Sequence, residues 1–208
     1  MEDKIFDSHC HIDFILDRKL RIRWIRNYQQ LVHRFPGMYH EKLEGFITNF
    51  CDPATWPDCA SPDILYCNDP NLTVRYTLGC HPHFAPAMLE VGAEVRLMEL
   101  LIQGRWEGVV AVGECGLDRS RGNKVHLAVQ IAAFKIQVGV AMRLNLPLVL
   151  HLRGTEEEGA QVLRDCGLPT SWPIHLHCWN SSREKCEEWL KEWTGSVVGL
   201  TGLVSFRF

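Results

Sequence analysis

The chain has 208 residues, and 46% of them are hydrophobic, which is enough for one domain with a large core. Its formal net charge is −3, so the chain as a whole is not a polycation, and an anionic substrate would need a local source of positive charge. There is no run of about 18 apolar residues, and the first residues lack the pattern of a signal peptide. These features argue against a membrane span and against secretion.

The nine cysteines are odd in number and include no C-x-x-C pair, so they do not suggest a disulfide framework. This usage is typical of reduced thiols inside a cell. The sequence therefore predicts an intracellular protein of the nucleus or the cytoplasm.

Short apolar segments alternate with helical segments along the chain. The sequence predicts strands over residues 4–12, 43–50, 74–81, 108–114, 147–152, 173–179 and 195–202. It predicts helices over residues 16–35, 88–103, 125–145, 156–166 and 183–193. Nearly all-apolar strands between helices indicate a parallel α/β fold, either a doubly wound sheet or most of a TIM barrel.

Histidines gather where the predicted strands end. They are His9, His11, His81, His83, His151, His175 and His177. His9 and His11 alternate with Cys10, so both imidazoles face the same side of their strand. Glu114 ends the fourth predicted strand, and this edge of an α/β fold is where ligands gather. Imidazoles beside a carboxylate predict a metal site, for Zn²⁺, Mn²⁺, Fe or a harder ion.

Cysteines next to these residues offer a competing thiolate zinc site. They are Cys10, Cys80, Cys115 and Cys178. Strand alternation opposes this site, because the neighbour of an inward-facing residue points outward into the helix layer. Small buried thiols pack well there, and this structural interpretation is the favoured one.

At these residues the sequence resembles the TatD family of metal-dependent nucleases, and most closely its animal branch. The motifs that carry the resemblance are "DSHCHID", "GCHPHF", "GECGLD", "LPLVLHLR", "LHCW" and "VGLTG". Their order and spacing agree over nearly the whole chain. The resemblance implies a TIM (β/α)₈ barrel of the metal-dependent hydrolase type that hydrolyses DNA or RNA phosphodiesters, typically as an exonuclease from the 3′ end.

The resemblance also assigns roles to individual residues. It implies two divalent ions, Mg²⁺ or Mn²⁺ for activity, with Zn²⁺, Ni²⁺ or Fe as other occupants of the site. The implied metal ligands are His9, His11, Glu114, His151 and His177, with Glu114 bridging the two ions. His81 and Arg153 match positions that face the scissile phosphate, and His175 is ranked as a structural or supporting residue.

One family feature has no counterpart in the chain. The family's eighth strand carries "ETDAPY", whose Asp binds metal, and this motif does not occur in the sequence. The expectation is a single catalytic domain over residues 1–208 that is incomplete at its C-terminus, without the eighth strand and the final helices. Such a form is expected to be less active, and to be a monomer that can associate through an open barrel seam.

Two basic stretches follow predicted strands, where loops lie at the active face of a barrel. Arg119, Arg121 and Lys124 are predicted to bind substrate phosphates beyond the scissile one. Residues 18–26, with Trp24, combine charge with an aromatic ring suited to base stacking. The alternative for residues 18–26 is a solvated helix face. Asp118 is predicted to order its loop.

Three functions therefore compete. The first is a metal-dependent nuclease with single-stranded DNA or RNA, or nucleic acid ends, as its partner and with no membrane partner. The second is a small-molecule amidohydrolase, since related barrels use similar ligands. The third is an inactive relative that only binds metal or nucleic acid. Glu114 and the "GCHPHF" segment favour the nuclease.

Overall fold

A computed structural model describes residues 4–15, 30, 33–35, 37, 42–56, 72–104 and 108–201. Seven parallel strands form one sheet, and each strand pairs with the next one in chain order. The strands are β1 (Ile5–Cys10), β2 (Leu43–Phe50), β3 (Thr73–Leu78), β4 (Val109–Asp118), β5 (Leu148–Arg153), β6 (Ile174–Leu176) and β7 (Ser196–Val198). This arrangement confirms the predicted parallel α/β fold.

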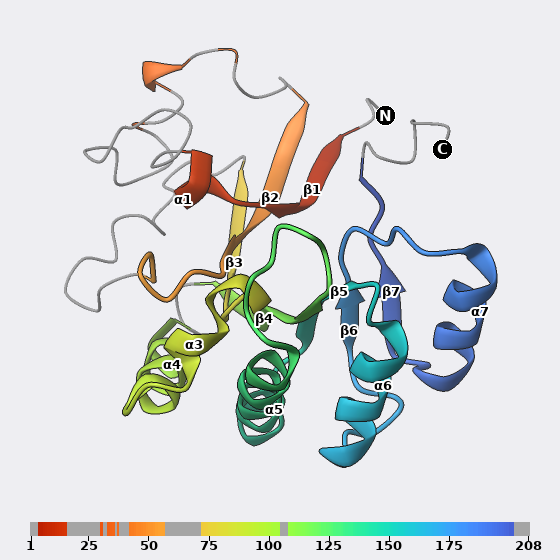
Figure 1. Ribbon diagram of the computed structural model, residues 1–208. Helices are drawn as coiled ribbons and strands as arrows, with labels where there is room; N and C mark the ends of the chain where they lie inside the picture. The colour runs from red at the N-terminus through yellow and green to blue at the C-terminus, as the bar shows by residue number, and fades with distance from the viewer. Residues whose placement is uncertain are drawn as a thin grey trace.

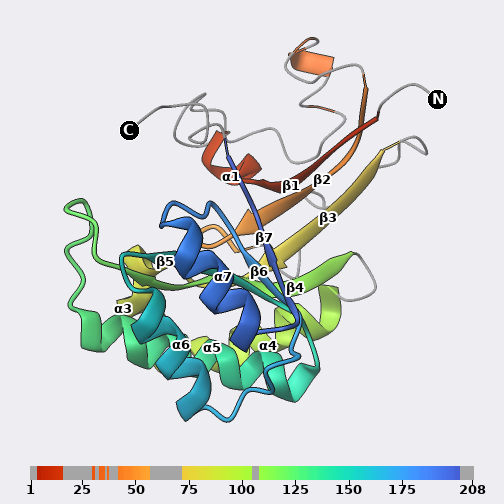
Figure 2. The same cartoon turned by 90° about the vertical axis from the view of Figure 1, so that its right-hand side faces the viewer.

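The helices follow the strands in alternation. They are α1 (Ile12–Phe14), the 3-10 helix η3 (Pro82–Phe84), α3 (Ala85–Met88), α4 (Ala93–Gly104), α5 (Leu127–Leu144), α6 (Glu156–Asp165) and α7 (Arg183–Glu192). Figure 1 shows α4, α5, α6 and α7 side by side along one side of the sheet. Figure 2 shows α4, α5 and α6 below the strands, on the side away from α1. Most of the predicted helix 16–35 lies outside the described residues.

The sheet curls toward closure. The rings of His9, on β1, and His177, directly after β6, stack with their centroids 4.0 Å apart and their planes at 12°. Four strands separate β1 from β6 in the sheet, so this contact requires strong curvature. Within the described ranges, β7 does not pair with β1, and no further strand lies between them. The sheet therefore has the shape of an open barrel, with α4, α5, α6 and α7 along its convex side.

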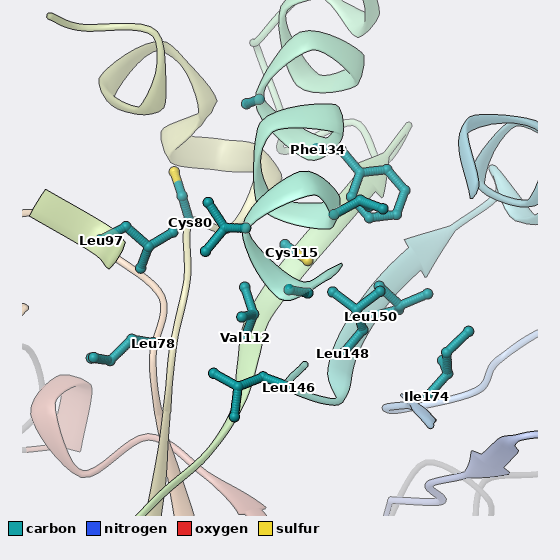
Figure 3. Packing of buried hydrophobic residues seen from close by; sticks show 14 of the residues in the cluster. Leu78, Cys80, Leu97, Val112, Cys115, Phe134, Leu146, Leu148, Leu150 and Ile174 are labelled. Atoms are coloured by element: carbon teal, nitrogen blue, oxygen red, sulfur yellow. The ribbon is translucent and has the colours of Figure 1, made fainter. Parts of the chain in front are cut away.

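The core lies between the sheet and its helices, with α5 at its centre. Figure 3 shows Phe134 of α5 above residues of β4 and β5, among them Cys115 and Leu150. Helix α5 has a mean hydropathy of 1.4 over 18 residues and is the one helix in the described chain that is long and apolar enough to cross a membrane. Because its buried residues pack against β4, this composition also suits a helix at the centre of a core.

Several predicted elements differ from the structure. The third and seventh strands end at Leu78 and Val198, before their predicted limits of 81 and 202. The helix predicted over 88–103 begins only at Ala93, as α4, because Gly92 takes a left-handed φ of +85° directly before it. The fourth strand does not end at Glu114, since β4 continues to Asp118. The sixth strand ends at Leu176, so His177 lies in the turn that follows it. The last two differences move site residues relative to the strand ends.

The core position of Phe134 gives a stability prediction. Phe134 is fully buried, so Phe134→Ala should leave a cavity and lower the free energy of unfolding by about 3–5 kcal/mol. Val91 is fully exposed, and Val91→Ala should change that free energy by less than about 0.5 kcal/mol. Urea unfolding followed by circular dichroism would measure both. Similar losses in the two variants would contradict this account of the core.

Candidate metal centre

Glu114 lies at the centre of the candidate site. Its side chain is 2% exposed, and it projects from β4 where the pairing with β5 shifts register between Gly113 and Cys115. Gly113 has φ +146°, and a Cβ atom there would lie 2.5 Å from the carbonyl oxygen of Val149. A glycine is therefore required before Glu114 if β5 is to approach β4 this closely.

His9, near the end of β1, and His11, directly after it, reach this carboxylate. Their Nε2 atoms lie 3.3 and 3.2 Å from Oε2 of Glu114 and 3.2 Å from each other. Nδ1 of His11 lies 2.9 Å from the carbonyl oxygen of Asn49, to which it donates, and this leaves a lone pair on Nε2. The structure thus brings both imidazoles of the H-x-H motif to one oxygen of Glu114.

His151 and His177 meet the other oxygen of the same carboxylate. Nδ1 of His151 and Nε2 of His177 lie 2.8 and 2.6 Å from Oε1 of Glu114 and 3.0 Å from each other. The backbone N–H of His177 donates to the carbonyl oxygen of Leu150 at 3.1 Å. This bond holds the turn after β6 against β5, and so it sets the two histidines side by side.

The two groups suit divalent cations. Ligands about 2.0–2.1 Å from an ion such as Zn²⁺ lie roughly 3 Å from one another, which is the spacing of the imidazole and carboxylate atoms on each side of Glu114. Oε2 of Glu114 is buried close to two imidazoles, yet it accepts no hydrogen bond from the described residues. Such close contacts without hydrogen bonds are expected of atoms that share a cation. The residues present therefore fit two ions bridged by Glu114.

Electrostatics keep the central carboxylate ionised. Burial opposes the charge on Glu114, but the surrounding histidines hold the pKa of its carboxyl well below the usual range. Burial also opposes protonation of His151, while its contacts with Asp118 and Glu114 raise the pKa of the imidazole to about 9. An arriving cation must displace that proton, so metal binding at this group is expected to release protons.

His81 and Arg153 border the site. Burial lowers the pKa of His81 to about 3, so its ring is neutral. Its Nδ1 accepts from the backbone N–H of His83 at 3.1 Å, which leaves the ring proton on Nε2, 3.6 Å from Oε1 of Glu114. Arg153 ends β5 two residues after His151, so both side chains leave the same face of the strand. His81 thus places an N–H donor beside Glu114, and Arg153 lies on the face of β5 from which His151 projects.

Asp118 is a second buried carboxylate, at the end of β4, and is 2% exposed. Its Oδ2 lies 3.1 Å from Nε2 of His151 and 3.2 Å from Nε2 of His83. Its Oδ1 accepts from the N–H of Ser120 at 2.5 Å, in keeping with the predicted loop-ordering role. His81, Asp118 and His151 also form a third group of possible ligands, with atoms within 4.8 Å of one another.

The predicted phosphate contacts lie on the loop after β4. The guanidinium of Arg119 pairs with Glu158 of α6 at 2.7 Å, which ties this residue to a helix. Lys124 donates from Nζ to the carbonyl oxygen of Arg121 at 3.0 Å, and both residues are exposed. Arg121 and Lys124 thus remain candidates for phosphate binding. The basic stretch 18–26 lies outside the described residues.

His175 and the cysteines lie beside the ligand groups. The ring centroid of His175 is 6.1 Å from that of His9, and burial lowers the pKa of His175 to about 4. Cys115 is fully buried in the core, where burial raises the pKa of its thiol, and burial raises that of Cys10 to about 12. Among the described residues, no cysteine joins a ligand group, so the geometry favours the structural interpretation.

Two buried glutamines of α5 were not predicted to support the site. The side-chain amide of Gln130 pairs with the backbone N–H and C=O of Asp118 at 2.8 and 3.2 Å. Gln137 pairs in the same way with Cys80, next to His81, at 2.6 and 3.1 Å. Polar residues seven positions apart in an apolar helix lie on one face, and this spacing is the signal that could have identified them.

The chain is similar in sequence to curated human and bacterial proteins. The human protein named 3′-5′ RNA nuclease TATDN2 is 29% identical over 206 residues, which are 99% of this chain and 26% of that protein. The protein of Erwinia amylovora named 3′-5′ ssDNA/RNA exonuclease TatD is 37% identical over 130 residues, which are 62% of this chain and 46% of that protein. The chain thus spans less than half the length of these curated relatives. The match to the human protein covers 99% of this chain and agrees with the expected likeness to the animal branch.

Solved structures share the fold. A TatD family hydrolase from Entamoeba histolytica has a TM-score of 0.77 at 19% identity, with 97% of this chain and 66% of that chain covered. The TatD homologue YJJV from Escherichia coli has a TM-score of 0.73 at 24% identity, with 97% and 70% covered. Residues 6–207 match the family described as TatD related DNase. The chain belongs to the TatD related DNase family.

Proposed function

We propose that the chain catalyses metal-dependent hydrolysis of phosphodiester bonds in single-stranded DNA or RNA, working from the 3′ end. One observation carries the proposal: two histidine pairs, from opposite parts of the curled sheet, face the two oxygens of one buried carboxylate. Two cations held about 4 Å apart are a common arrangement for phosphodiester hydrolysis. The names of the human and bacterial relatives, which act on RNA or on single-stranded DNA and RNA, support this choice of substrate.

The ligand sets assign a role to each residue. His9 and His11 would hold one ion, and His151 and His177 the other, with Glu114 between them. Divalent ions bound there would supply Lewis-acid charge for a phosphoryl oxygen and would lower the pKa of a water molecule. Glu114, held ionised among the four histidines, fixes the separation of the two groups.

The bordering residues would orient the substrate. His81 is neutral with its proton on Nε2, so it can donate a hydrogen bond to a phosphate oxygen without competing for a cation. The Arg153 guanidinium can bind two phosphate oxygens at once. Arg121 and Lys124 are exposed on the loop after β4, where they would contact phosphates farther along the strand.

A nuclease assay with controlled metal content tests the proposal. The protein should shorten a 5′-labelled single-stranded oligonucleotide in steps in Mn²⁺ or Mg²⁺, and chelator should remove all of this activity until Mn²⁺ is restored. An oligonucleotide blocked at its 3′ end should resist. Cleavage that persists in chelator would contradict the proposal. Hydrolysis of cyclic amides in place of the oligonucleotide would favour an amidohydrolase instead.

A further inference from the structure

We propose that Asp118 is a positioning residue that fixes the ring of His151, so that Nδ1 faces Glu114 and His177. These three residues, Glu114, His151 and His177, are called the second metal group below. The inference rests on the proposed function, because it assigns a role within the same metal centre. It concerns the side of His151 that points away from Glu114, where Nε2 lies 3.1 Å from Oδ2 of Asp118. Gln130 of α5, in turn, holds Asp118 in place.

The chemistry of the two ring nitrogens carries the first step. An ionised carboxylate only accepts hydrogen bonds, so in the metal-free form both ring nitrogens of His151 donate, Nδ1 to Glu114 and Nε2 to Asp118. A cation that displaces the proton from Nδ1 leaves the proton that Nε2 shares with Asp118. Nδ1 is then free to act as a ligand, and it lies 2.8 Å from Glu114 and 3.0 Å from His177. A carboxylate on the far side of a metal-binding imidazole sets its tautomer and orientation and raises its basicity.

The surroundings of Asp118 show that it is itself held rigidly. Its side chain is almost fully buried, and its carboxylate accepts from three donors, namely His151, His83 and the N–H of Ser120. Its backbone forms two hydrogen bonds with the Gln130 amide, which is also buried. Because α5 packs along β4, Gln130 connects the second metal group to the long apolar helix of the core.

These contacts also decide between two roles for Asp118. As a direct ligand it would have to give up donors that already occupy both of its oxygens. As a residue that only orders its loop, it would need Ser120 but neither histidine. The hydrogen bond from a ring whose other nitrogen faces Glu114 and His177 favours the positioning role.

Titration of the metal-free protein with Mn²⁺ by calorimetry tests the inference. Asp118→Leu should weaken one of two binding events by about 10–100-fold, the usual effect of removing a supporting partner of a metal ligand, and leave the other unchanged. Asp118→Asn keeps an acceptor for His151 and should restore part of the affinity. Gln130→Met should weaken the same event by a smaller factor.

Gln137→Met is the matched control, because Gln137 makes the same pair of backbone bonds from the same helix but holds Cys80. It should match Gln130→Met in its loss of thermal stability and leave both Mn²⁺ affinities unchanged. Long-range ¹H–¹⁵N spectra of the Zn²⁺-loaded, histidine-labelled protein add a direct readout. The signal lost in His151→Gln should report a proton on Nε2 in the wild type, and Asp118→Leu should lose that preference.

The outcomes separate the two proposals. A wild type that binds no divalent ion would overturn the proposed function together with this inference. A wild type that binds two ions, beside Asp118→Leu and Asp118→Asn variants with unchanged affinities and an unchanged His151 tautomer, would overturn this inference alone. Should Asp118→Leu fail to fold, Asp118→Asn against Gln137→Met still decides the question.

Discussion

Glu114→Gln is expected to lower nuclease activity by at least about 10³-fold, equivalent to roughly 4 kcal/mol of barrier. The amide keeps the size of the side chain but removes the negative charge. It also replaces one of the two oxygens between the histidine pairs with an N–H₂ group that cannot bind a cation. Both metal groups should therefore weaken together. Calorimetry with Mn²⁺ and the oligonucleotide assay would measure the two effects on one preparation.

Cys115→Ala is the control for this result. Cys115 follows Glu114 in the chain, but its thiol lies in the core, with Sγ 3.8 Å from the carbonyl oxygen of Val149. Its removal should lower stability by about 1 kcal/mol and leave metal affinity and activity unchanged. Equal losses of activity in the two variants would show that the thiol faces the site and that the assigned faces of β4 are wrong.

His11→Ala and His177→Ala should each abolish the binding of a different ion. The two residues face opposite oxygens of Glu114, so each substitution removes one ligand from one group and leaves the other group complete. Each variant should lose activity by roughly 10²–10³-fold, because hydrolysis needs both ions. Calorimetry should show one remaining Mn²⁺ site in each variant.

The double variant provides the test of independence. His11→Ala combined with His177→Ala should bind no ion tightly, yet should lose little more activity than either single variant, since residues that act as one unit are not additive. His175→Ala serves as the comparison, because His175 joins neither ligand group and should retain both sites. Loss of both ions in the His11→Ala variant alone would contradict the division of ligands proposed above.

Most of the fold was predictable from local sequence patterns. The second strand was predicted at its observed limits, because it is rich in β-branched and aromatic residues. The start of α4 after Gly92 was missed, since an isolated glycine in a helical pattern does not by itself mark a helix end. The end of β6 at Leu176 was missed because Cys178 and Trp179 extend the apolar composition past it.

The part of the candidate site that lies near strand ends was predictable from the sequence. His9, His11, His151 and His177 were all placed at that edge, and the structure brings them around Glu114. The pairing of Arg119 with Glu158 was not foreseeable, because it joins a loop to a helix that follows a different strand. The hydrogen bonds of Gln130 and Gln137 were missed for the same reason. Contacts between distant segments depend on packing, which spacing along the chain does not reveal.

The stacking of His9 on His177 has a consequence for folding. The candidate ligands come from β1 and from the turn after β6, on opposite sides of the curl, so bound ions would cross-link the beginning of the chain to its distant later part. Such closure over a long loop is entropically costly and slow. Ligand at 100 times its dissociation constant stabilises the form that binds it by about 2.7 kcal/mol. The concentration of the metal ion, as well as the temperature, would then determine the fraction of molecules in which β1 stays paired with the sheet.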